Sequence, residues 1–228
     1  MDRPFNDILE ETYRQRLEIG FLPSYTQWTE APAHFSDHAL EINGHPVMED
    51  WEDGYMKELA AIACARGGTV LEVGFGMGIS ARYVQAQGIA EHLIIESNAD
   101  VFKKLREFAI RSSVKTMPLF GFWQNVTPTL PAGSIDGILF DTYPLTSEEI
   151  HRNHFNFFKE AWRLLRPGGV LTYYSDEIED FSSEHVSRLH QTGFMRIEKK
   201  VVAVEPSADC KYWRSKTIVA PIITKEHA

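Results

Sequence analysis

The sequence predicts an α/β fold in which helices cover both faces of a mostly parallel, seven-stranded sheet. Apolar, β-rich runs alternate along the chain with segments whose apolar residues recur every three to four positions. The last two β-rich runs follow each other with no helical pattern between them. Alternation of this kind calls for a parallel sheet covered on both faces, and the final pair adds an antiparallel C-terminal edge.

The elements are expected in the following order. Amphipathic helices are predicted over 4–17 and 51–66, with a proline-containing loop between them. The parallel strands are predicted over 69–73, 92–96, 114–120, 135–140 and 170–174. Further helices are predicted over 79–87, 99–111 and 148–165, and the closing strands over 195–204 and 216–223.

Length and composition favour one domain in a reducing compartment. The 228 residues, 43% of them hydrophobic, suffice for a single core over 1–228, in which residues 1–45 form an N-terminal helix and loop that could cover the active site. Two cysteines, Cys64 and Cys210, suit neither a disulfide framework nor a cysteine metal cluster. With neither a signal peptide nor a membrane-length apolar run, the chain is expected to be cytoplasmic.

Charge and histidine spacing narrow the classes of partner. A net charge of −9 disfavours a phosphate backbone, so no nucleic-acid partner is predicted. The nine histidines show no spacing typical of metal ligands, so no metal is predicted. The apolar face formed by Phe5, Ile8, Leu9 and Tyr13 could cover the active site or a partner, and a monomer or a homodimer is equally compatible with the sequence.

A glycine-rich loop follows the first predicted strand of the sheet. Gly74, Gly76 and Gly78 alternate with larger residues, and Glu72 lies two residues ahead. Glycine lets a ligand approach the main chain closely, so the pattern indicates a nucleotide pocket, although an ordinary strand-to-helix turn is the alternative. A dinucleotide fingerprint would need its third glycine where Ile79 stands.

Polar and aromatic residues follow the next strands at the edge where such sheets bind ligands. Glu96 is placed to accept hydrogen bonds from ribose hydroxyls, and Ser97 and Asn98 could cap the next helix or reach an adenine. The pair Phe122-Trp123 could supply a flat wall for that ring or belong to the core.

An acid at the end of a fourth strand is the second strong feature. Asp141 precedes Thr142-Tyr143-Pro144 and would face the bound ligand, although a turn cap is the alternative reading. Upstream, the acidic run 49–53 surrounds Trp51, and a solvated helix start is its simplest explanation.

Together these stretches resemble the guanidinoacetate N-methyltransferase family of class I S-adenosylmethionine-dependent methyltransferases. The stretches that carry the resemblance are Gly44-His45-Pro46-Val47-Met48-Glu49, Trp51-Glu52, Val70 to Met77, Ile94-Ile95-Glu96, Gly121-Phe122-Trp123, Phe140 to Leu145, Phe155-Asn156-Phe157, Arg163 to Thr172 and Ala208-Asp209-Cys210. The resemblance implies a Rossmann-like class I methyltransferase fold, with S-adenosylmethionine as cofactor and S-adenosylhomocysteine as product. The residues expected to bind the cofactor are Trp28, Met48, Glu72, Gly74, Phe75, Gly76, Met77, Gly78, Ile79, Glu96, Ser97, Asn98, Phe122, Trp123 and Asp141.

The same resemblance implies a small guanidino substrate gripped by two acids, Glu52 and Asp141. A guanidinium has a pKa above about 12 and is a poor nucleophile, so paired carboxylates are needed to bind its planar edge and to accept a proton. Tyr143, Asp176 and Glu177 complete the expected substrate contacts. Where the family has a neutral Leu-Thr pair that receives the substrate carboxylate, this chain has Asp176-Glu177, which favours a related guanidino compound with a longer, neutral or cationic tail.

Other functions are compatible with parts of this pattern. An arginine N-methyltransferase acting on protein or free arginine would share the glycine loop and the Asp-Thr strand end. A non-catalytic cofactor-binding subunit would keep the loop but lose Glu52 and Asp141, and a nicotinamide dehydrogenase is disfavoured by the position of Gly78.

Overall fold

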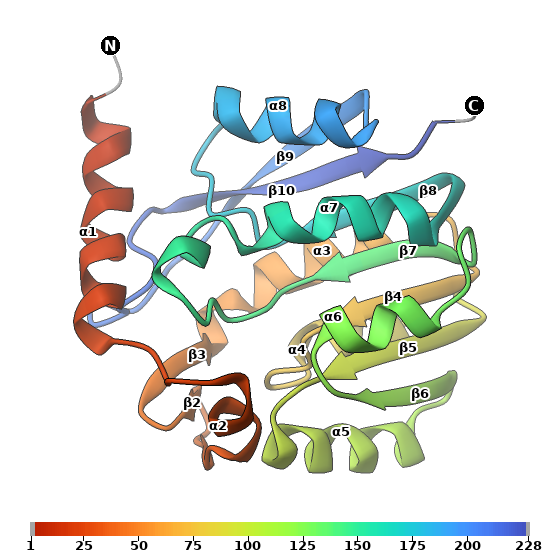
Figure 1. Cartoon of the computed structure of the whole chain (residues 1–228), viewed down its shortest axis with the longest axis horizontal. Helices are drawn as coiled ribbons and strands as arrows, with labels where there is room; N and C mark the ends of the chain where they lie inside the picture. Colours follow the sequence, from red (N-terminus) through yellow and green to blue (C-terminus); the bar gives the residue numbers. More distant parts are fainter. Residues whose placement is uncertain (1–2, 227–228) are drawn as a thin grey trace.

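The computed structural model describes residues 3–226, with side chains from Asp7 onward, and is organised around a seven-stranded sheet (Figure 1). The strand order is β6-β5-β4-β7-β8-β10-β9. The parallel strands are β4 (Thr69–Val73), β5 (Glu91–Glu96), β6 (Lys115–Phe120), β7 (Ile135–Phe140) and β8 (Leu165–Tyr173). Strand β10 (Thr217–Thr224) is antiparallel to both β8 and β9 (Arg196–Ala203). The predicted mostly parallel sheet with an antiparallel C-terminal edge is confirmed.

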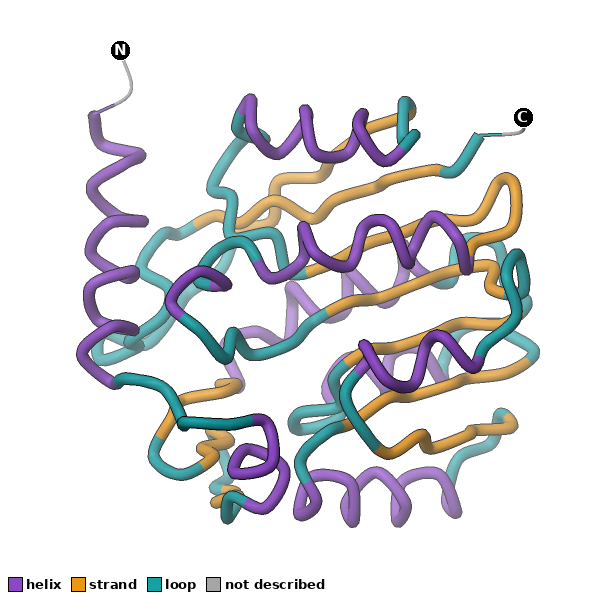
Figure 2. Tube along the Cα trace, viewed as in Figure 1, coloured by secondary structure: helices purple, strands orange, loops and turns teal. Residues whose placement is uncertain are grey.

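Helices cover both faces of this sheet, as the alternating sequence pattern predicts (Figures 1 and 2). One face carries α3 (Asp53–Ala63), α4 (Ile79–Gln85) and α5 (Ala99–Arg111), whose Leu59, Val84 and Leu105 belong to one apolar cluster. The other face carries α6 (Trp123–Val126), α7 (Asn153–Leu164) and α8 (Ser183–Thr192), whose Phe157 and Leu189 belong to a second cluster. The sheet therefore separates two cores.

Several element boundaries differ from the prediction. Helix α7 begins at Asn153 instead of residue 148, because η3 (Ser147–Glu149) forms a separate 3₁₀ turn and His151 has a positive φ of 59°. The 3₁₀ turn η1 (Asp50–Glu52) likewise precedes α3. Helices α6 and α8 were not predicted.

The predicted loop before residue 50 was wrong, because it contains a second, three-stranded antiparallel sheet. Its strands are β1 (Ala33–Phe35), β2 (Ala39–Ile42) and β3 (His45–Glu49). Asn43 and Gly44 connect β2 to β3 with φ values of 48° and 77°, the conformation that a two-residue hairpin turn requires. Together with the unpredicted α2 (Tyr25–Glu30), this small sheet lies beside the carboxyl ends of the parallel strands (Figure 1).

Helix α1 (Arg3–Ile19) stands at the same edge of the main sheet (Figure 1). The Oγ1 atom of its buried Thr12 lies 3.2 Å from the Nε2 atom of His151. Glu11 of the same helix forms a 3.5 Å ion pair with Arg214. No helix between residues 3 and 226 combines the length and apolar character needed to cross a membrane. The N-terminal elements thus gather where the parallel strands end.

The central strand β7 tolerates no side chain at Gly137. A Cβ there would lie 1.7 Å from the carbonyl oxygen of Ala63 in α3. We therefore expect Gly137→Ala to lower the free energy of unfolding by about 2–3 kcal/mol, because α3 must move off the sheet. Urea unfolding measures this, with Gly88→Ala as control, since a Cβ at Gly88 meets nothing within 4 Å. If Gly137→Ala and Gly88→Ala lowered the free energy of unfolding by the same amount, the prediction would be contradicted.

Candidate active site

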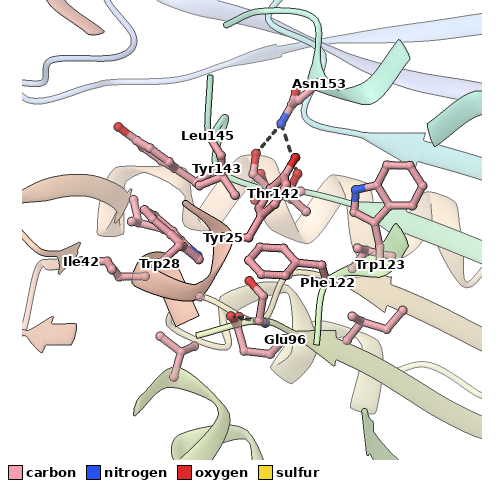
Figure 3. A pocket seen from close by; sticks show the side chains of 18 of the residues that line it. Tyr25, Trp28, Ile42, Glu96, Phe122, Trp123, Thr142, Tyr143, Leu145 and Asn153 are labelled. Atoms are coloured by element: carbon pink, nitrogen blue, oxygen red, sulfur yellow. Dashed lines mark hydrogen bonds between the residues drawn. The ribbon is translucent and has the colours of Figure 1, made fainter. Parts of the chain in front are cut away.

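Two cavities meet at the carboxyl end of β7. The first has a volume of about 870 Å³, part of it open to solvent, and is lined by β4, β5, α2 and the small sheet. The second has a volume of about 430 Å³, also partly open to solvent, and extends toward α1. The residues that line both are Val47, Asp141, Thr142, Tyr143 and Asn153. Asn153 holds this junction in shape, because its side-chain amide donates to the Thr142 carbonyl and, at 3.2 Å, to the Thr142 hydroxyl (Figure 3).

The glycine loop forms the floor of the first cavity. Gly74 and Gly76 line it and have φ values of 95° and 53°. A Cβ on Gly74 would lie 1.9 Å from the Asp141 carbonyl oxygen, and one on Gly76 would lie 2.9 Å from Met48 Sδ. The loop is therefore packed so closely that only glycine fits at these two positions, and its main chain is exposed to a ligand.

Glu96 ties this loop to the end of β5. Its Oε1 accepts the main-chain N–H groups of Ser97 and Asn98, both at 2.7 Å, and Oε2 accepts that of Phe75 at 3.1 Å. Burial raises the pKa of this carboxyl, although the N–H groups oppose the shift. Oε2 keeps acceptor capacity toward the cavity, so Glu96 fits a ribose diol.

Aromatic side chains form the walls of the first cavity (Figure 3). Tyr25 and Phe122 have ring centroids 4.7 Å apart, and Trp28 stacks on Tyr143 at 5.1 Å. Trp123 lines the cavity but also packs in the core, with its ring 5.1 Å from that of Phe157. The cavity thus offers flat apolar surfaces to a purine ring.

Several residues expected at the cofactor lie outside the lining of the first cavity and support it from behind. They are Glu72, Phe75, Met77, Gly78, Ile79 and Asn98. Buried Glu72 accepts a hydrogen bond from Ser80 and lies 2.9 Å from His92 Nε2, which ties β4 to α4 and β5. Asn98 caps α5 and donates at 2.9 Å to the Trp28 carbonyl, so it positions α2.

Glu52 and Asp141 both line the second cavity, where Glu52 is buried and Asp141 is partly exposed. Glu52 is 2% exposed, and its Oε1 accepts the Tyr212 hydroxyl at 2.6 Å and the Glu49 N–H at 3.0 Å. Burial and the charge of Asp141 raise the pKa of Glu52 to about 8, and these two hydrogen bonds oppose the shift. Burial, followed by the charges of Asp176 and Glu72, raises the pKa of Asp141 to about 7.

The predicted substrate residues Asp176 and Glu177 are separated by the fold. Asp176 lines the second cavity, with Oδ1 2.9 Å from His151 Nδ1. Burial works to raise the pKa of Asp176, but His151 and Arg16 hold it below its usual value. Glu177 points elsewhere, since its Oε1 accepts the Ser182 N–H at 2.9 Å and lies 3.1 Å from His185 Nδ1.

Sequence reasoning missed part of both linings. Leu40 and Ile42 of the small sheet line the first cavity, and their alternation on either side of Glu41 before Asn43-Gly44 was a usable hairpin signal. Arg16, Tyr174 and Tyr212 line the second cavity. Among residues 3–226, no group of three or more His, Cys, Asp and Glu side chains is arranged to hold a metal ion.

The strand order, the glycine loop after β4 and the acid after β7 define a class I methyltransferase fold. Solved structures share it at 14% identity: spermidine synthase from Thermotoga maritima has a TM-score of 0.61 and covers 85% of this chain and 72% of its own. The structure of M. jannaschii TYW2 in complex with AdoMet has a TM-score of 0.58, and the match covers 86% of this chain and 87% of TYW2. The family model for guanidinoacetate N-methyltransferase matches residues 23–226, so the chain belongs to that family.

Curated relatives with another name match a smaller part of the chain. "Protein arginine N-methyltransferase 2" of Yarrowia lipolytica is 32% identical over 137 residues, which is 57% of this chain and 28% of the relative. The protein of the same name from Saccharomyces cerevisiae is 30% identical over 152 residues, which is 62% of this chain and 36% of the relative. The chain therefore spans about a third of the length of these relatives.

Removing one acid from the pair Glu52 and Asp141 should stabilise the protein at high pH. Between the ordinary pKa of 4.5 and the folded value of about 8 for Glu52, the folded state binds more protons than the unfolded state, so stability falls as pH rises. We expect the melting temperature of Glu52→Gln at pH 8.5 to be roughly 5 °C higher than that of the unmodified chain. A gain of about 2 kcal/mol in the free energy of unfolding produces a shift of this size in a domain of this length. The difference should vanish near pH 4.5.

Calorimetry at the two pH values measures this shift. The amide oxygen introduced by Glu52→Gln would still accept the Tyr212 hydroxyl, so no hydrogen bond needs to be lost. Glu179→Gln serves as control, because Glu179 is exposed. A shift in melting temperature that did not depend on pH would contradict the assigned burial cost.

Proposed function

We propose that the protein transfers a methyl group from S-adenosylmethionine to a guanidino nitrogen of a small molecule. The observation that supports this function best is that two acids, buried Glu52 and partly exposed Asp141, line one cavity and that Asp141 also lines the first cavity. The negative charge of Asp141 makes Glu52 harder to ionise, and the charges of Asp176 and Glu72 do the same to Asp141, so a planar cation that donates hydrogen bonds to both acids would stabilise them most. A guanidinium has that shape and charge.

The first cavity suits S-adenosylmethionine. Phe122 and Tyr25 offer apolar surface to an adenine, Glu96 offers an acceptor to a ribose, and the Gly74–Gly76 main chain can lie against the methionine part. Family membership supports this cofactor, as does the shared fold of TYW2, which was solved in complex with AdoMet. When bound, the cofactor supplies an electrophilic methyl group on a positively charged sulfur.

Asp141 is the residue we assign as aligner and base. It lines both cavities, and its carboxylate has no hydrogen-bonding side chain among the described residues, so both oxygens are open to a substrate. Its raised pKa of about 7 suits a proton acceptor at neutral pH. Asp141 would take the proton that the guanidino nitrogen loses as the N–CH₃ bond forms and the S–CH₃ bond breaks, while Glu52 holds the other edge.

Arginine, free or in a protein, is the second candidate substrate. The relatives named protein arginine N-methyltransferase 2 favour it, because arginine presents the same guanidinium. The position of α1 favours a small molecule, because Arg16 from this helix lines the second cavity and is buried there.

A methyl-transfer screen separates these substrates. Radiolabelled S-adenosylmethionine would be offered with guanidinoacetate, guanidinopropionate, guanidinobutyrate, agmatine, free arginine and an arginine-containing peptide. We expect transfer to at least one small guanidino compound, with the peptide at least tenfold poorer in kcat/KM. Failure of all of these guanidino compounds to accept a methyl group would rule out the proposed function.

Neutralising Asp141 should separate chemistry from cofactor binding. We expect Asp141→Asn to lower kcat by about 10³-fold, because the nitrogen loses its base, while calorimetric affinity for the cofactor changes little. For the unmodified chain, kcat/KM should fall as pH drops below about 7, where the Asp141 carboxylate takes up its proton. Normal turnover by Asp141→Asn, or a flat profile from pH 5 to 8, would refute the assigned role. Glu179→Gln is again the matched control.

A further inference from the structure

The second cavity contains a buried cation that has no ion-pair partner. Arg16 of α1 is 8% exposed and lines this cavity. Among the described residues, no carboxylate lies within ion-pair distance of its guanidinium, and its Nε lacks a hydrogen-bond partner. Arg14, on the exposed face of the same helix, is by contrast paired with Glu10 at 3.4 Å.

Aromatic rings and a polar chain hold Arg16 in place. Its guanidinium carbon lies 5.7 Å from the ring centroids of both Tyr143 and Tyr212. One helical turn earlier, Thr12 contacts His151, and His151 contacts Asp176, so α1 is anchored to the rim of the cavity. The guanidinium is therefore positioned by the fold and is not a surface side chain that happens to reach inward.

Three of the acids in this region already contact other side chains. Asp176 Oδ1 lies 2.9 Å from His151 Nδ1, Glu52 accepts the Tyr212 hydroxyl, and Glu177 contacts His185 away from the cavity. The charge of Arg16 lowers the pKa of Asp141, yet the two side chains form no ion pair. A buried guanidinium with an unsatisfied N–H is costly, and an incoming anion would remove that cost.

We propose that Arg16, on the helix that precedes the family match, is the specificity-determining residue of this chain and binds the carboxylate of a guanidino acceptor in place of the segment at 176–177. This inference rests on the proposed function: Glu52 and Asp141 take the guanidinium, and Arg16 takes the opposite charge in the same cavity of about 430 Å³. A carboxylate matches the planar fork of Arg16 through two charge-assisted hydrogen bonds. The acidic pair that sequence reasoning placed against an anionic tail does not oppose it, because His151 offsets Asp176 and Glu177 points away.

Two acceptors of equal length isolate the carboxylate. Guanidinopropionate ends in a carboxylate where propylguanidine ends in a methyl group, and the two compounds are otherwise the same. We expect the unmodified chain to prefer guanidinopropionate, and Arg16→Gln to raise KM for it by about 100-fold with kcat changed little, as loss of one partner of a buried charge pair does. The kcat/KM for propylguanidine should fall at least tenfold less than that for guanidinopropionate, because only the effect of the Arg16 charge on Asp141 reaches both acceptors.

Control variants separate recognition from folding. Arg14→Gln removes a charge from the exposed face of α1 and should alter neither acceptor. Arg16→Lys keeps the charge but loses the fork, so it should raise KM for guanidinopropionate by about tenfold and leave propylguanidine unchanged, even if Arg16→Gln does not fold.

Four results would overturn the inference. The Arg16 variants could lose the same factor in kcat/KM for both acceptors, or the unmodified chain could use both acceptors equally well. Either result would be compatible with guanidino methylation but would show that Arg16 is not the carboxylate site. Methylation of Arg16 itself in the absence of other acceptors would show that its guanidinium occupies the acceptor position. Failure of every guanidino compound would overturn the proposed function, and this inference with it.

Discussion

The pairing of β4 with β7 at the centre of the sheet is the contact on which the site depends. Parallel neighbours end at the same edge, so the glycine loop after β4 and Asp141 after β7 meet although they are distant in sequence. The Asp141 N–H donates to the Val73 carbonyl at 2.9 Å, and Gly74 packs so closely on the Asp141 carbonyl that a Cβ could not be accommodated. Main-chain contacts therefore set the distance between the glycine loop and Asp141. Such rigidity suits an in-line displacement, in which the reacting atoms must be held about 3–3.5 Å apart.

Burial gives the same site its electrostatic character. Glu52 and Asp141 have pKa values of about 8 and 7, so in the empty site at neutral pH the pair retains protons that isolated carboxyls would have lost. A guanidinium placed between them favours the ionised forms, so substrate binding and proton release are coupled. The positive sulfur of the cofactor would act in the same direction. The pair is thus costly to the fold when empty and becomes favourable when the cationic ligands arrive, as expected of groups selected for function over stability.

The parts of the fold that were predictable from sequence are those with strong local patterns. The apolar runs at 69–73 and 135–140 and the periodic segment 99–111 match β4, β7 and α5 residue for residue. The location of Asp141 followed from the rule that parallel strands end together. The direction of Glu177 could not be predicted, because it is set by His185 on a helix whose packing is non-local. Arg16 was missed because a single arginine on an amphipathic helix is usually solvated, and only the docking of α1 buries it.

The position of Arg16 also separates what family membership explains from what it leaves open. The family match begins at residue 23 and includes Glu52, Asp141 and the glycine loop, the groups that would hold a guanidinium near a methyl donor. These groups would suit the guanidinium of guanidinoacetate and that of arginine alike, and the chain is similar to proteins of either name. Helix α1 precedes the matched region, so Thr12 and Arg16 belong to the part of the chain that the family does not define. In this arrangement the shared core would determine the reaction, and a separate helix borders the cavity. The helix could then select the tail of the substrate without altering the chemistry at Asp141.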